Sequence, residues 1–142
     1  MSVDPGVNSM ARILIIDDEL NILNVISTLM ELEGHETVTV LGGERAKDLI
    51  VGEEFDLMIT DIRMTPVNGM ELLRLAHEHR PNMQVIMLTA YGQVETAVEA
   101  MELGAFDYVN KPMRADDLVD VVNRALAFGQ LDADTDETDA PA

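Results

Sequence analysis

The sequence lacks cysteine, and it has few basic residues. Without cysteine, disulfide bonds and thiolate metal sites are excluded. Nine Lys and Arg stand against 27 Asp and Glu, so the formal net charge is −18. A surface of this charge repels phosphate backbones, and we therefore do not expect direct binding to nucleic acid.

Long hydrophobic runs are also missing. The longest apolar stretches have the length of a strand, far below the ~20 residues needed to cross a bilayer, and the N-terminus shows no basic start followed by an apolar run. We therefore expect a cytoplasmic protein without membrane contact. With 142 residues, 47% of them hydrophobic, the chain fits one domain with a sizeable core.

Hydrophobic periodicity predicts five strands and five helices in strict alternation. The expected strands are 12–17, 36–41, 56–61, 84–89 and 106–110, and the expected helices are 19–33, 43–51, 70–79, 93–103 and 114–128. Alternation with short loops implies right-handed crossovers, and hence an α/β fold with a doubly wound parallel sheet.

The two ends of the chain lack this periodicity. Residues 1–10 include Pro5 and Gly6 and little apolar content, which indicates a flexible lead. Residues 129–142 contain five acidic residues and no basic one, which favours a disordered acidic tail. The folded domain is expected to span 11–128.

Polar residues follow four of the predicted strands. Asp17 and Asp18 come after the first strand, Asp61 ends the third, Thr89 ends the fourth, and Lys111 follows the fifth. In open α/β sheets, ligands bind in the crevice outside the carboxyl ends of the strands. We therefore expect three carboxylates, a hydroxyl and an ammonium group in one site.

This set of side chains suits a metal ion and an anionic ligand. Neighbouring carboxylates raise one another's pKa unless a cation compensates their charge. Mg2+ prefers a few carboxylates together with water and phosphate oxygens. The ammonium and the hydroxyl add donors for a group with several anionic oxygens, and phosphate is the group that fits this pattern best.

Four motifs then carry a family resemblance. They are Ile15-Ile16-Asp17-Asp18-Glu19, Ile59-Thr60-Asp61-Ile62-Arg63-Met64, Leu88-Thr89-Ala90 and Tyr108-Val109-Asn110-Lys111-Pro112. In this order and spacing, over about 12–128, the chain resembles the receiver domain of two-component response regulators, of the chemotaxis-receiver type. Residues 88–112 look particularly like receivers of nitrogen-regulation-type activators. The resemblance implies a flavodoxin-like (βα)5 fold with strand order 2-1-3-4-5.

The resemblance also implies roles for the acidic residues. Asp61 matches the phosphoacceptor, which makes the chain a signalling domain that catalyses only its own phosphorylation and dephosphorylation. Asp17 and Asp18 match the acidic pair that holds Mg2+ together with Asp61, and Arg63 would offer its backbone carbonyl to the metal. Pro66 lies one residue later than the family pattern has it.

The remaining roles concern the switch and the partners. Lys111 matches the lysine that pairs with the phosphoryl group, Thr89 the switch hydroxyl, and Tyr108 the aromatic side chain whose orientation reports phosphorylation. The implied phosphodonor is a histidine kinase or a phosphotransfer protein, and the implied response includes a phosphorylation-dependent homodimer or an output partner. Arg63 and Tyr91 match the positions that flank the approach of a hydrolysing water, and their bulk predicts slow loss of the phosphoryl group.

Other interpretations compete with this one. An aspartyl-phosphate phosphatase of related fold also uses an Asp at a strand end, but it normally has a second Asp where this chain has Arg63. A flavin-binding module would need a phosphate loop rich in Ser, Thr or Gly after the first strand. Tyr108 could be an ordinary strand aromatic. The three histidines, His35, His77 and His79, are expected on the solvated surface.

Overall fold

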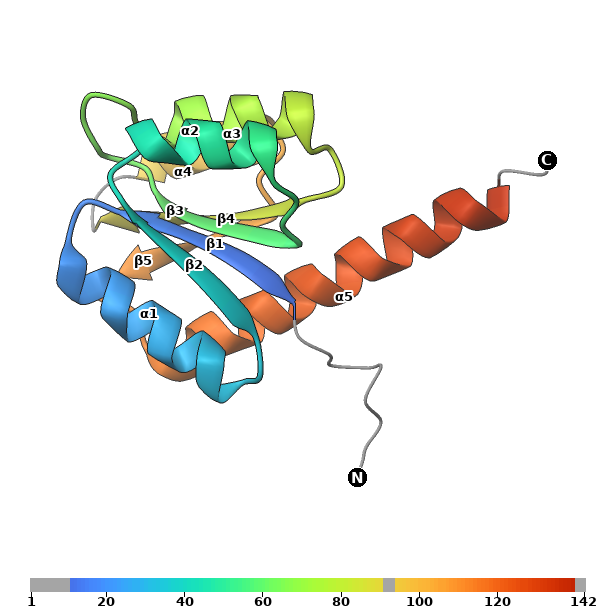
Figure 1. The fold of residues 1–142 in the computed structure, drawn as a ribbon, viewed down its shortest axis with the longest axis horizontal. Coiled ribbons are helices and arrows are strands. Elements are labelled where there is room, and N and C mark those ends of the chain that lie inside the picture. The colour runs from blue at the N-terminus through green and yellow to red at the C-terminus, as the bar shows by residue number, and fades with distance from the viewer. Residues whose placement is uncertain (1–10, 91–93, 140–142) are drawn as a thin grey trace.

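A computed structural model describes residues 11–90 and 94–139 of the chain, with side chains as far as Gln130 (Figure 1). Strands and helices alternate along the described residues, as predicted. The strands are β1 (Arg12–Asp17), β2 (Glu36–Leu41), β3 (Leu57–Asp61), β4 (Gln84–Ala90) and β5 (Asp107–Lys111). The helices are α1 (Leu20–Leu32), α2 (Glu44–Gly52), α3 (Gly69–His79), α4 (Val94–Glu102) and α5 (Ala115–Asp139).

The strands form one parallel sheet in the order β2-β1-β3-β4-β5. This order confirms the expected doubly wound, flavodoxin-like fold. All five residues of β3 are buried, as a central strand covered by helices requires. The edge strand β2 has exposed, half-buried and buried positions, which agrees with its alternating Thr-Val-Thr-Val sequence.

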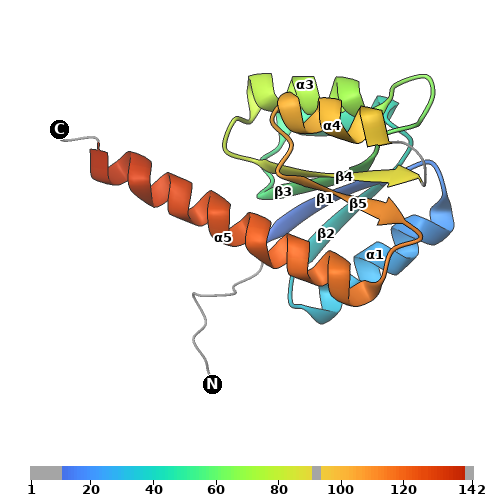
Figure 2. The same cartoon turned by 180° about the vertical axis from the view of Figure 1, so that it is seen from behind.

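Helices cover both faces of the sheet. Figures 1 and 2 show α2, α3 and α4 on one face and α1 and α5 on the other. Alternate residues of β1 divide between the two cores, since Leu14 and Ile16 pack with the first helix layer and Ile13 and Ile15 with the second. Among the described residues, no helix has both the length and the apolar character that a membrane crossing demands.

Local sequence signals set the helix ends. In α1, Leu23, Ile26 and Met30 are buried at helical spacing, and the helix stops at Gly34, whose φ of 94° is a conformation that suits glycine. Helix α3 begins with a capping box. There the Asn68 side chain accepts a hydrogen bond from the Glu71 backbone N–H, and the Glu71 side chain accepts one from the Asn68 backbone N–H.

The last helix corrects a prediction. Helix α5 runs to Asp139, whereas the sequence predicted its end at Phe128 and a tail without regular structure beyond it. Figure 2 shows the added turns projecting past the sheet. Gly129 weakens a helix by only about 1 kcal/mol, and the next proline is Pro141, so the sequence contains no strong stop between them. The predicted lead, 1–10, lies outside the described residues.

His35 is a second correction, because it is buried and not on the solvated surface. Its side chain is 8% exposed, and its Nδ1 accepts a hydrogen bond of 3.1 Å from the backbone N–H of Ala11. Burial lowers the pKa of His35 below its ordinary value of 6.5, against the opposing effect of Glu33 and Asp56. His77 and His79 are exposed as expected.

This arrangement predicts acid sensitivity. A histidine with a lowered pKa in the folded state stabilises the fold above pH 6.5, and that contribution is lost as the pH falls from 6.5 through the folded-state pKa. The unfolding free energy of the wild type should therefore drop by on the order of 1 kcal/mol more between pH 7.5 and 5.5 than that of His35→Asn, whose amide oxygen can accept the same hydrogen bond. Urea titrations at both pH values test this, and parallel losses would contradict it.

Candidate functional site

The carboxyl ends of β1, β3 and β5 bring a lysine between two aspartates. Lys111 Nζ lies 2.9 Å from Asp17 Oδ2 and 3.3 Å from Asp61 Oδ2. The side chains are almost withdrawn from solvent, with exposed fractions of 15% for Lys111, 0% for Asp17 and 9% for Asp61. Because β1 and β3 are neighbours and β5 lies two strands from β3, only a long side chain on β5 can reach both carboxylates.

Burial dominates the electrostatics of these three groups. It raises the pKa of Asp17 and of Asp61 above the ordinary value of 3.8, while Lys111 acts in the opposite direction on both. Asp61 further raises the pKa of Asp17, and Asp18 raises that of Asp61. Burial lowers the pKa of Lys111, but the two aspartates outweigh it and the net pKa is raised above 10.5. The lysine is therefore charged at neutral pH.

The negative charge at this edge exceeds what Lys111 can balance. Oxygens of Asp17, Asp18 and Glu19 lie within 4.8 Å of one another. Asp17 Oδ1 accepts a hydrogen bond from the Glu19 backbone N–H, and its buried Oδ2 lies 2.9 Å from Lys111 Nζ. One ammonium group thus faces both Asp17 and Asp61 while two further, exposed carboxylates lie beside them, and this set of oxygen donors fits a hard divalent cation. Glu19 was not predicted at the site, although it directly follows the Asp pair.

The loop after Asp61 folds back onto the end of β3. The backbone N–H of Gly69 donates to the Ile62 carbonyl at 2.8 Å, and a Cβ at Gly69 would overlap the backbone carbonyl oxygen of Asp61. Only glycine permits this approach. The backbone N–H of Arg63 acts to lower the pKa of the Asp61 carboxyl, and the Arg63 side chain is exposed. The loop is therefore closed tightly against the backbone at the end of β3.

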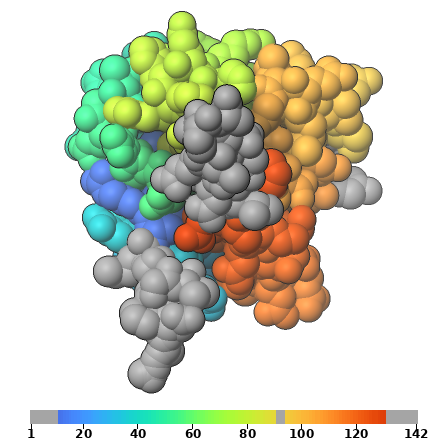
Figure 3. Space-filling model, turned by 90° about the vertical axis from the view of Figure 1, so that its right-hand side faces the viewer, coloured from blue at the N-terminus to red at the C-terminus, as the bar shows by residue number. Residues whose placement is uncertain are grey.

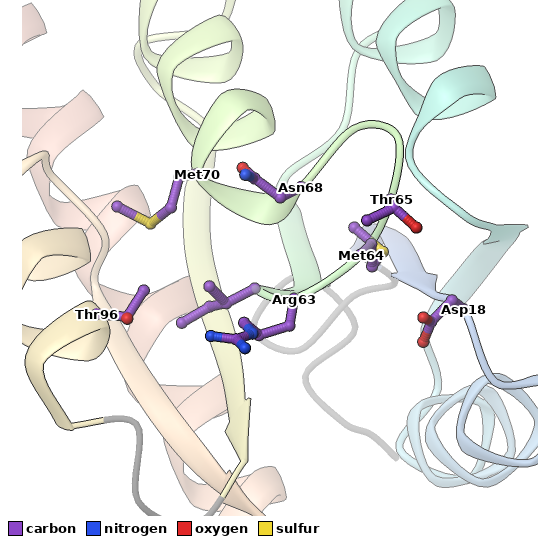
Figure 4. A pocket seen from close by; sticks show the side chains of 8 residues that line it. Asp18, Arg63, Met64, Thr65, Asn68, Met70 and Thr96 are labelled. Carbon is purple, nitrogen blue, oxygen red and sulfur yellow. The ribbon is translucent and has the colours of Figure 1, made fainter.

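An open pocket of about 500 Å³ adjoins this loop (Figure 4). In the figure, Arg63 lies between Asp18 on one side and Met70 and Thr96 on the other. The pocket is lined by Asp18, Ile62, Arg63, Met64, Thr65, Asn68, Met70 and Thr96. The pocket thus opens beside Asp18 and the loop that follows Asp61.

Thr89, near the carboxyl end of β4, and Tyr108, near the start of β5, do not join the charged group. Thr89 is 1% exposed, and its hydroxyl donates to the Ala90 carbonyl at 3.3 Å. Tyr108 is half-buried and packs against the core beneath α4. The Lys111–Pro112 peptide is cis. Tyr91 lies outside the described residues.

The raised pKa of Asp61 predicts how its removal changes stability. A carboxylate whose folded-state pKa is raised favours folding below its ordinary pKa of 3.8, and this benefit is lost as the pH rises through the raised pKa. In EDTA at pH 7, Asp61→Asn should therefore be more stable than the wild type by on the order of 1 kcal/mol, and the gap should close toward pH 3.8.

Asp48→Asn, an exposed aspartate of α2, controls for the change in net charge. Chemical denaturation series at three pH values decide the matter. An advantage of Asp61→Asn that is independent of pH would show that ionisation of Asp61 is not its source.

Comparisons with known proteins agree with this geometry. The family model described as "Response regulator receiver domain" matches residues 13–123. Regulatory protein AtoC of Escherichia coli is 42% identical over 120 residues, covering 84% of this chain and 26% of that protein. Response regulator protein FleR of Pseudomonas aeruginosa is 40% identical over 121 residues, covering 85% of this chain and 25% of that protein. The chain thus spans about a quarter of the length of these curated relatives.

Solved structures give the same result. NtrX from Brucella abortus superposes with a TM-score of 0.86 at 33% identity, covering 91% of this chain and 29% of that one. A receiver domain from Clostridium thermocellum superposes with a TM-score of 0.79 at 38% identity, covering 86% of this chain and 98% of that one. These likenesses confirm the predicted closeness to receivers of nitrogen-regulation-type activators. The chain belongs to the response regulator receiver domain family.

Proposed function

We propose that Asp61 accepts a phosphoryl group from a histidine kinase or phosphotransfer protein in the cytoplasm, and that this event switches the surface around α4 and β5. The observation that carries the proposal is the position of Lys111 Nζ, 2.9 Å from Asp17 and 3.3 Å from Asp61. A cation placed on the acceptor carboxylate can also pair with the oxygens of a transferred phosphoryl group. Arg63 cannot donate a proton at neutral pH, which favours a receiver over a phosphatase.

In the transfer, an oxygen of Asp61 forms a bond to phosphorus while the bond from phosphorus to the donor's nitrogen breaks. The electron pair of that bond leaves with the donor. Lys111 stabilises negative charge on the transferred oxygens, and Asp17 keeps the lysine in place from the side away from the acceptor.

Mg2+ is the cofactor that this site fits. Asp17, Asp18 and Asp61, with the backbone carbonyl of Arg63, would hold it, because a single lysine cannot balance the charge of these three carboxylates. When bound, the ion would neutralise charge between the carboxylates and the incoming phosphoryl oxygens. Glu19 lies close enough to contribute through water.

The switch would start at Thr89. Its hydroxyl now donates to a backbone carbonyl, and a phosphoryl group on Asp61 would offer a stronger, charged acceptor nearby. Rotation of Thr89 toward that group would release the Ala90 carbonyl at the point where β4 leads toward α4. Tyr108, packed beneath α4, would then repack as the loop moves.

The acceptor assignment predicts a specific loss of labelling. With acetyl phosphate and Mg2+, the wild type and Asp48→Asn should each gain one phosphoryl group in intact-protein mass spectra, and Asp61→Asn should gain none while keeping its fold by circular dichroism. Unchanged labelling of Asp61→Asn would refute the assignment.

The metal assignment predicts a ranking of variants. Asp18→Ala should weaken the Mg2+-dependent rise in melting temperature, with an apparent affinity reduced by on the order of tenfold, because it removes a direct carboxylate ligand. Glu19→Ala should have a smaller effect and Asp48→Ala none. Differential scanning fluorimetry across a Mg2+ series, with EDTA as the zero point, measures all three. Equal Mg2+ responses in Asp18→Ala and Asp48→Ala would count against ligation by Asp18.

A further inference from the structure

Helix α4 carries an apolar stripe that no described residue covers. Val94, Val98 and Met101 follow one another at helical spacing, and their exposed fractions are 62%, 48% and 38%. The buried residues of this short helix are only Ala97 and Ala100. The helix therefore leaves its larger apolar side chains outside the core and buries its smallest ones, the reverse of what packing alone favours.

An acidic stripe runs beside the apolar one. Glu95, Glu99 and Glu102 are exposed and also follow helical spacing. None of the three forms an ion pair within the described part of the chain, and α4 contains no basic residue. On the neighbouring side, Arg124 of α5 is already engaged by Asp107 and Asp120. Among the residues with described side chains, no cation therefore balances the carboxylates of α4.

The two stripes lie on the outer side of the helix. With about 100° between successive residues, Thr96 lies on the opposite flank from Val98. Thr96 lines the pocket beside the start of α3, so the apolar stripe lies on the flank toward β5. β5 is an edge strand, with β4 as its partner in the sheet. Figure 3 shows this part of the chain, in gold and orange at the upper right, at the molecular surface.

We propose that this α4 face binds a basic amphipathic helix of a partner protein, whose apolar side chains cover Val94, Val98 and Met101 and whose Lys or Arg side chains pair with the three glutamates. The proposal rests on the proposed function, since it names the chemistry of the output partner. Helical partners present anchors at the same three- and four-residue spacing as the stripe. Basic residues follow from charge complementarity with an unbalanced row of carboxylates.

A second copy of this chain is a poor occupant of the same face. Pairing α4 with α4 would bring two rows of three glutamates together with no basic side chain in either helix. Like charges juxtaposed in an interface disfavour it strongly. A chain of net charge −18 further repels its own copy.

The test uses a synthetic amphipathic helix of about 20 residues with a leucine stripe flanked by lysines, and the same peptide with glutamate in place of each lysine. Binding to the full chain is measured by calorimetry, with and without beryllium fluoride and Mg2+. One variant is Glu95→Gln/Glu99→Gln/Glu102→Gln. Its control, Asp48→Asn/Glu54→Gln/Glu78→Gln, removes the same charge from exposed sites elsewhere. A second comparison sets Val98→Ser against the control Val25→Ser, because Val25 of α1 is exposed to a similar extent, 52% against 48%.

The α4 triple variant should bind the basic peptide about tenfold more weakly, and its control triple less than about threefold more weakly. Val98→Ser should lose about fivefold and Val25→Ser nothing, and the glutamate peptide should not bind. Equal losses of peptide affinity in both triple variants, or in both serine variants, would overturn the proposal. So would a concentration-dependent dimer of the wild type, seen in sedimentation, that Val98→Ser abolishes.

Labelling of Asp61 by acetyl phosphate is recorded for every variant, which separates the two proposals. Normal labelling with no α4-dependent binding refutes the partner chemistry alone. Absent labelling in the wild type refutes the proposed function. Tighter peptide binding with beryllium fluoride would support both.

Discussion

One buried ion pair network determines the chemistry of this domain. Lys111 is the cation among the described residues that contacts Asp17 and Asp61, and without it two carboxylates would be buried at one sheet edge with nothing to balance them. The network remains acidic even so, because Asp18 and Glu19 lie beside Asp17. This excess of negative charge over the single lysine is the reason for proposing that a metal cation binds here together with a phosphoryl group.

The loop that follows β3 is held close to the backbone of Asp61. Gly69 lets the loop after β3 close onto the Asp61 carbonyl, and the capping box of Asn68 and Glu71 fixes where α3 begins. Asn68 also lines the pocket beside this loop, so one side chain both caps α3 and faces the pocket.

The pocket and helix α4 are close to each other on the surface of the domain. The pocket and α4 lie on the same side of the sheet, and Thr96 connects them because it lines the pocket from α4. A change in the loop beside Asp61 can therefore reach α4 over a short distance without passing through the core. Because only small alanines of α4 are buried, less free energy holds this helix to the sheet, which suits the rearrangement that the proposed switch requires.

Much of this arrangement follows from the sequence by itself. Hydrophobic runs ending in Asp17, Asp61, Thr89 and Lys111 predicted the sheet and the edge where these residues lie, because strand periodicity and short connections are local properties of a chain. Only tertiary structure decided that Ala11 meets His35, that Glu19 joins the carboxylates, and that the Thr89 hydroxyl turns to a carbonyl. Such features depend on contacts between segments that are distant in the sequence, or on the rotamer of a single side chain. Neither produces a periodic pattern in the sequence.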